Sequence, residues 1–163
     1  MERRFTHIDP DGNAVMVDVS EKAVTCRTAR ATGRISMSRE CFDMVAQGRA
    51  KKGDVLGVAQ VAGIMAAKRT DELIPLCHRL NLTGTALTFR LRPEDSAIEA
   101  VCTVKCHGTT GVEMEALTGV SAALLTVYDM CKAADRRMVI SDIRLLEKHG
   151  GKSGDFYFED EKP

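Results

Sequence analysis

The stretch that decides the fold is GVEMEALTGVSAALLTVYDMCKAAD, residues 111–135. Thr110 stands where it can cap a helix, and Glu113 stands where a capping-box carboxylate reaches back. The apolar residues that follow recur at three- and four-residue intervals, as on one face of a helix: Leu117, Val120, Leu124, Val127 and Met130. We therefore expect a core helix of about five or six turns, against which the rest of the chain packs.

The two ends of this helix carry charged residues that a core does not need. Glu115 lies near its start, while Asp129 and Lys132 lie one turn apart near its end. An ideal helix places Glu115 and Asp129 on nearly one face but about 21 Å apart along the axis. A single subunit would need a long ligand to contact both carboxylates. The alternative is a solvated Asp129–Lys132 ion pair, worth about 0.2–0.5 kcal/mol.

The other elements follow from shorter patterns. Strands are expected over 23–37, 80–92, 97–106 and 138–149, with the middle two forming an antiparallel hairpin. Ser38 should cap a short helix that ends near Ala46, and Asp54 should cap a longer helix over 55–73. The longer helix is expected to pack closely, with one stripe of Val58, Ala59, Ala62, Met65 and Ala66.

The order of these elements predicts an α+β fold. The same order of elements occurs in the ferredoxin-like split βαβ sandwich, in which helices cover one face of an antiparallel sheet. The other face must be solvated or buried in an oligomer, and Val139, Ile143 and Leu145 favour burial. We expect one domain over 1–163, with an irregular N-terminal arm at 1–22 and a mobile tail at 150–163.

The composition limits the classes of partner that the protein can be expected to bind. Lys+Arg and Asp+Glu both number 23, so no net field attracts nucleic acid or a membrane. The six cysteines are scattered without a CxxC pair, and the opening residues show no signal-peptide pattern. We expect a cytoplasmic protein with reduced thiols, no metal site, and no nucleic-acid or membrane partner.

Reactive side chains gather in four patches: Lys51–Asp54, Leu73–Arg79, Gly111–Glu115 and Asp129–Lys132. Each patch alone has an ordinary explanation, such as a solvated turn or a structural histidine. Together they offer lysines, a histidine and carboxylates, which suit proton transfers on a polyanionic substrate. No P-loop, HExxH or GxSxG motif occurs, which argues against Walker-type hydrolysis and serine acyl transfer.

Several of these strings carry a family resemblance. They are MVDVS (16–20), KGDV (52–55), AGIMAAKRTDELIPLCH (62–78), TGVEMEALT (110–118), YDMCKA (128–133) and GGKSGDF (150–156). From about Thr6 to Phe156, the chain resembles the cyclic pyranopterin monophosphate synthases, the protein C family of molybdenum cofactor biosynthesis. The resemblance implies a lyase that converts 3′,8-cyclo-7,8-dihydro-GTP to cyclic pyranopterin monophosphate and releases pyrophosphate. It also implies a homohexamer, a trimer of dimers with active sites at subunit interfaces.

The resemblance assigns roles by motif. It implies Lys52, Asp129 and Lys132 as catalytic residues. It implies substrate contacts at Leu76, Cys77, His78, Met114 and Glu115, with Lys68 and Arg27 as phosphate or purine partners. We expect the lysines to hold the triphosphate, Asp129 with Lys132 to manage proton transfers, and Glu115 with His78 to contact the guanine-derived ring. No resident cofactor is implied, and Mg²⁺ accompanying the triphosphate is left open.

Two other functions are weighed. An RNA- or nucleotide-binding protein of the same fold would show exposed aromatic residues on its sheet and a basic surface. A catalytically inactive scaffold subunit of the pathway would bind substrate without turnover. Its one sequence support is Arg79, which stands where the family usually has proline.

Overall fold

The computed structural model describes residues 6–158 with the exception of residue 52. The elements follow the predicted order, with a short added strand at the end: β1 (Thr25–Ser36), α1 (Arg39–Ala46), α2 (Val55–Ala67), α3 (Thr70–Leu73), β2 (Leu82–Arg92), β3 (Ala97–Gly108), α4 (Glu113–Cys131), β4 (Val139–His149) and β5 (Phe156–Tyr157). No helix within these described ranges combines the length and apolar character that crossing a membrane requires.

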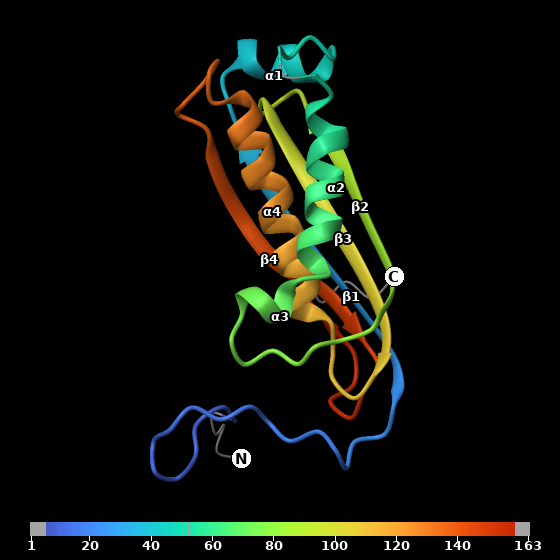
Figure 1. Ribbon diagram of the computed structural model, residues 1–163. Coiled ribbons are helices and arrows are strands. Elements are labelled where there is room, and N and C mark those ends of the chain that lie inside the picture. Colours follow the sequence, from blue (N-terminus) through green and yellow to red (C-terminus); the bar gives the residue numbers. More distant parts are fainter. Residues whose placement is uncertain (1–5, 52, 159–163) are drawn as a thin grey trace.

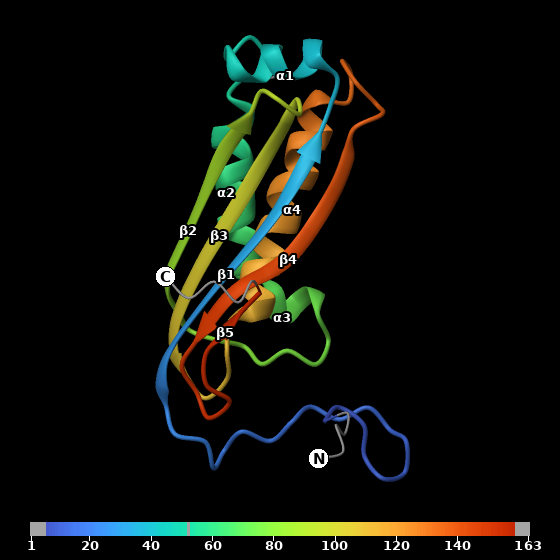
Figure 2. The ribbon, with the colours of Figure 1, turned by 180° about the vertical axis from the view of Figure 1, so that it is seen from behind.

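The strands form one antiparallel sheet in the order β2-β3-β1-β4-β5. The central strand β1 pairs with β3 from Thr25 opposite Gly108 to Ser36 opposite Ala97. Helices α2 and α4 lie along one face of the sheet (Figure 1), and the view from behind shows the other face without helices (Figure 2). The predicted α+β fold is therefore confirmed.

The core lies between the sheet and α4. On β1, Ala29, Ala31 and Ile35 are fully buried, because alternate residues of a strand point to the same face. Val120 and Leu124 of α4, also fully buried, belong to the same cluster. Gly33 of β1 lets both helix side chains approach the strand, since a Cβ there would overlap them.

Two predicted caps are confirmed. The Ser38 side chain accepts a hydrogen bond from the Cys41 amide at 3.3 Å, and Asp54 accepts one from the Gly57 amide at 2.9 Å. The predicted capping box of α4 is wrong. The Thr110 hydroxyl donates to the Gly111 carbonyl instead, so the helix begins at Glu113 without a side-chain cap.

The expected helix over 55–73 is two helices, and its predicted stripe is partly wrong. The Thr70 hydroxyl donates to the carbonyl of Ala67 at 3.1 Å, where α2 ends, and α3 begins at Thr70. The residues of α2 that are buried are Val55, Ala59, Gly63 and Ala67, while Val58 and Met65 are about half exposed. The close contact with α4 selects the smallest side chains, so hydrophobicity alone did not identify the packed face.

The last part of the chain also differs from expectation. Strand β5 pairs with β4 inside the segment predicted to be a mobile tail, and the Phe158 amide donates to the Leu146 carbonyl at 2.8 Å. Residues 159–163 of that tail, like residues 1–5 of the arm, lie outside the described residues. Leu145 packs against the core and Ile143 approaches α4 beside Gly33, so neither marks the open face. The register of β4 shifts in this region, which changes the expected alternation.

Candidate functional site

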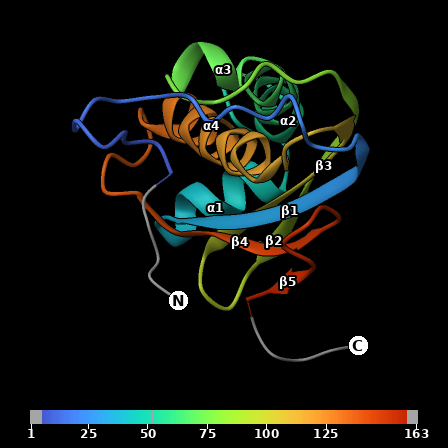
Figure 3. The same cartoon turned by 90° about the horizontal axis from the view of Figure 1, so that it is seen from below.

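Two adjoining cavities lie where α4 begins. The smaller, of about 300 Å³, is lined by the arm, by the loop that follows α3 and by the first turn of α4. The larger, of about 840 Å³, is lined by the end of the arm, the start of β1 and the 148–153 loop. Four lining residues are common to both: Lys22, Thr110, Gly111 and Glu113. Seen from below, the arm crosses this end of the molecule (Figure 3).

Most of the predicted substrate-binding residues come together here. The smaller cavity is lined by five of them: Leu76, Cys77, His78, Met114 and Glu115. Arg27 lines the larger cavity. Lys68 is the exposed C-cap residue of α2 and lines neither cavity. Three segments distant in sequence thus meet at one place, namely the start of β1, the 76–78 loop and the start of α4.

Glu115 is the electrostatically unusual residue of the smaller cavity. Its side chain is buried, with the residue only 5% exposed. Burial raises the pKa of its carboxyl to about 7, and the nearby carboxylates of Glu113 and Asp71 add to this rise. Burial likewise raises the pKa of the Cys77 thiol, with Glu115 contributing. A carboxyl that titrates near neutrality can donate or accept a proton during a reaction.

His78 is oriented by the arm. Its Nε2 lies 2.8 Å from the carbonyl oxygen of Val17. Arg79, next in sequence, is exposed and does not line either cavity. His78 lies in the wall of the smaller cavity with the exposed Arg79 beside it.

The larger cavity offers cations. Arg27 is 9% exposed, and one of its terminal nitrogens donates to the Thr109 carbonyl at 3.3 Å. Its Nε is buried and has no hydrogen-bond partner among the described residues. Gly150 and Gly151 both have left-handed φ, and a Cβ at Gly151 would overlap the Arg27 guanidinium. The glycine-rich loop therefore has to be free of side chains where it wraps around this arginine.

Three lysines add further positive charge to the larger cavity. The cavity wall includes Lys22, Lys148 and Lys152, and Lys148 also lies 3.8 Å from Glu113. The sequence motifs did not single out Lys22, Lys148 or Lys152 as site residues. The signal that could have found this set was the GGKSG string itself, since glycines beside a lysine and a serine are typical of anion-binding loops.

Two of the three predicted catalytic residues lie elsewhere. Asp129 and Lys132 sit at the opposite end of α4 and form an ion pair of 2.7 Å, with both side chains more than half exposed. The hydrogen bond to Asp129 raises the pKa of Lys132, so within one chain this lysine is a cation. Neither residue lines the two cavities, and Lys52 lies outside the described residues.

The sequence of the chain is similar to one family model and to several known proteins. The model of the MoaC family matches residues 16–151. A protein of Clostridium botulinum is 58% identical over 98% of this chain and 100% of its own length. Relatives from Chloroflexus aurantiacus (58% identical, 93% of each chain) and Clostridium perfringens (56% identical, 97% of this chain and 100% of the relative) are similar to it as well. All three bear the name cyclic pyranopterin monophosphate synthase. By the match to the family model and the identity to these relatives over nearly its whole length, the chain belongs to the MoaC family.

Proposed function

We propose that the protein is a cyclic pyranopterin monophosphate synthase. It converts 3′,8-cyclo-7,8-dihydro-GTP to cyclic pyranopterin monophosphate in molybdenum cofactor biosynthesis and releases pyrophosphate. The observation that carries this proposal is the pair of adjoining cavities at the start of α4, one with ionisable ring-binding groups and one with cations. That division matches a substrate with a purine-derived ring and a triphosphate. The scaffold and nucleotide-binding alternatives are not favoured, because the relatives that match nearly the whole chain are named as synthases.

The substrate would lie across both cavities. Arg27, Lys148 and Lys152 would hold the triphosphate, because their charges offset those of the phosphates and of the departing pyrophosphate. Glu115 and His78 would contact the ring in the smaller cavity. A buried carboxyl that titrates near neutrality suits ring atoms that gain and lose protons.

The active site would be completed by a second copy of the chain. Helix α4 is 19 residues long, and Asp129 and Lys132 lie at the end remote from Glu115. Its rise separates Glu115 from Asp129 by about 21 Å. We propose that Asp129, Lys132 and Lys52 of one subunit reach the cavities of another, where Asp129 coupled to Lys132 moves protons during ring opening and closure.

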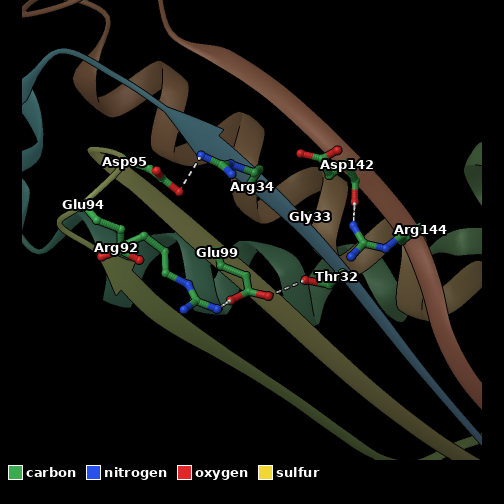
Figure 4. A pocket seen from close by; sticks show the side chains of 9 residues that line it. All are labelled: Thr32, Gly33, Arg34, Arg92, Glu94, Asp95, Glu99, Asp142 and Arg144. Carbon is green, nitrogen blue, oxygen red and sulfur yellow. Dashed lines mark hydrogen bonds and ion pairs between the residues drawn. The ribbon is translucent and has the colours of Figure 1, made fainter. Parts of the chain in front are cut away.

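A trimer of dimers needs two different contact surfaces, and the chain has two candidates. The open sheet face carries a hollow of about 360 Å³ that is lined by charges of both signs (Figure 4). Within it, Arg34 pairs with Asp95 at 3.4 Å and Arg92 with Glu99 at 2.8 Å. A surface with both signs can pair with itself across a two-fold axis. The second candidate is the outer side of α2, where Val58, Val61 and Met65 are exposed.

The test is pyrophosphate release from enzymatically prepared 3′,8-cyclo-7,8-dihydro-GTP. The parent should release it, and folded Lys52→Ala and Asp129→Asn variants should not. The assay is run with and without Mg²⁺, because a change in KM would reveal a metal that travels with the triphosphate. Substrate binding without release by the folded parent would instead identify a scaffold protein. We expect this chemistry in the cytoplasm, where scattered thiols stay reduced.

Sharing of the site is tested separately by mixing inactive variants. Glu115→Ala and Asp129→Asn subunits are unfolded together and refolded as mixed oligomers. If each site combines the two ends of α4 from different subunits, roughly a quarter of the sites receive two intact halves and activity returns. Each variant refolded alone is the control. Absence of recovery in mixed oligomers would place both residues in the same subunit's site.

A further inference from the structure

The MVDVS segment of the N-terminal arm contacts the candidate site. Val17, Val19 and Lys22 line the smaller cavity together with His78. The segment is shaped by a local turn, in which the Asp18 carboxylate accepts from the Ser20 amide at 2.9 Å and from its hydroxyl at 2.6 Å. These two bonds also lower the pKa of the Asp18 carboxyl. The arm is thus an ordered wall of the cavity.

The contact between the arm and His78 decides which ring nitrogen carries a proton. The partner of Nε2 is the Val17 carbonyl oxygen at 2.8 Å, and a carbonyl oxygen can only accept. The hydrogen bond therefore requires a proton on Nε2. In the neutral imidazole the other nitrogen, Nδ1, then has a free lone pair. It is the only ring nitrogen left to act on a ligand.

We propose that the arm is a positioning element of the site, and that the Val17 carbonyl holds His78 as the Nε2–H tautomer so that Nδ1 accepts a hydrogen bond from the ligand. The matching ligand group is an N–H or O–H donor, such as the amide N–H of a purine-derived ring. The identity of that ligand rests on the proposed function. The tautomer and its dependence on the arm do not.

A second histidine of the chain, His149, contrasts with His78 in the ring nitrogen that it uses. His149 presents its other nitrogen to a partner, since its Nδ1 lies 3.2 Å from Oδ2 of Asp155. A carboxylate oxygen accepts, so this ring should carry its proton on Nδ1. His78 and His149 are therefore expected to be opposite tautomers in the same molecule, while the exposed His107 serves as a reference for an exposed ring.

The tautomers are read directly by nitrogen NMR of the full-length protein labelled with ¹⁵N-histidine. The His78 signals are assigned by their loss in His78→Gln. We expect His78 to show a protonated Nε2 and an unprotonated Nδ1 above its titration, and His149 to show the reverse. A protonated Nδ1 in His78, or averaging of its two nitrogens as in His107, would overturn the proposal. This measurement uses no substrate, so its outcome is independent of whether the proposed reaction is correct.

A matched pair of deletions tests the role of the arm. Removing residues 2–14 leaves Val17 in place, whereas removing residues 2–20 takes its carbonyl away. We expect the His78 tautomer to survive the first deletion and to be lost in the second, with melting curves showing that both variants fold. KM for the substrate should be at least about tenfold higher in the second than in the first, because the second deletion removes the His78 hydrogen bond together with the cavity-lining Val17 and Val19. Retention of the tautomer in both would show that another group holds Nε2.

Discussion

At the scale of the residue, Glu115 couples the site to pH. Its carboxyl has a pKa of about 7 in the folded chain against 4.5 for the ordinary group. Between these values the folded state keeps a proton that the unfolded state has released, so the free energy of unfolding falls as pH rises through this window. The whole shift corresponds to about 3 kcal/mol. A buried carboxyl is thus retained at a cost to stability, as expected of a group that serves a reaction.

We predict that Glu115→Gln removes this dependence on pH. From pH 4.5 to 7.5 the parent should lose about 2–3 kcal/mol more of its free energy of unfolding than the variant, since glutamine has no proton to release. Urea unfolding at several pH values measures the difference. Glu72→Gln, at an exposed carboxylate, is the control and should follow the parent. Equal slopes for the parent and Glu115→Gln would show that Glu115 ionises normally.

At the scale of the element, the contact between α2 and α4 depends on glycine. A Cβ at Gly63 would stand 2.7 Å from the Gly119 carbonyl oxygen, which is backbone and cannot turn aside. Alanine gains about 1 kcal/mol of helix propensity over glycine, while overpacking costs about 1–3 kcal/mol. We predict that Gly63→Ala is net destabilising in urea unfolding. The control is Ala62→Ser at a half-buried neighbouring position, which should change the free energy of unfolding by less than about 0.5 kcal/mol. If Gly63→Ala were instead more stable than the parent, the two helices would be able to move apart to accept the new methyl group.

The 150–154 loop offers a second prediction at this scale. Gly151 and Gly154 both have left-handed φ, so alanine strains the backbone at either position. Only at Gly151 would the new Cβ also overlap the Arg27 guanidinium, because nothing lies within 4 Å at Gly154. Gly151→Ala should therefore weaken binding of inorganic pyrophosphate by about tenfold, whereas Gly154→Ala should change it little. Titration calorimetry measures both, and equal losses would mean that strain alone matters.

At the scale of the whole molecule, the outer side of α2 exposes the apolar side chains of Val58, Val61 and Met65. Val61 is 57% exposed at the centre of its stripe. We predict that Val61→Asp lowers the oligomer mass measured by light scattering, because a buried charge without a partner opposes association. Val61→Ala should keep the assembly. Activity should fall with the mass if sites are shared between subunits, and an unchanged mass for Val61→Asp would exclude this side of α2 from the interface.

Sequence alone determined the features that depend on neighbours along the chain. The period of the apolar residues in α4 and the caps at Ser38 and Asp54 report local faces and local hydrogen bonds. Six of the residues that the family motifs single out line the two cavities, although the motifs could not show how they are arranged.

Only the tertiary structure showed which element each face of a helix or strand packs against. The small residues of α2 are buried because Gly119 and Ala123 of α4 approach there, which no period along α2 could reveal. The candidate site joins residues 17–22, 76–78, 110–115 and 148–153, and only the folded chain brings these segments together. The separation of Glu115 from Asp129 is visible in both the sequence and the tertiary structure. The length of one helix predicts it, and the structure confirms that the two residues lie at opposite ends of α4.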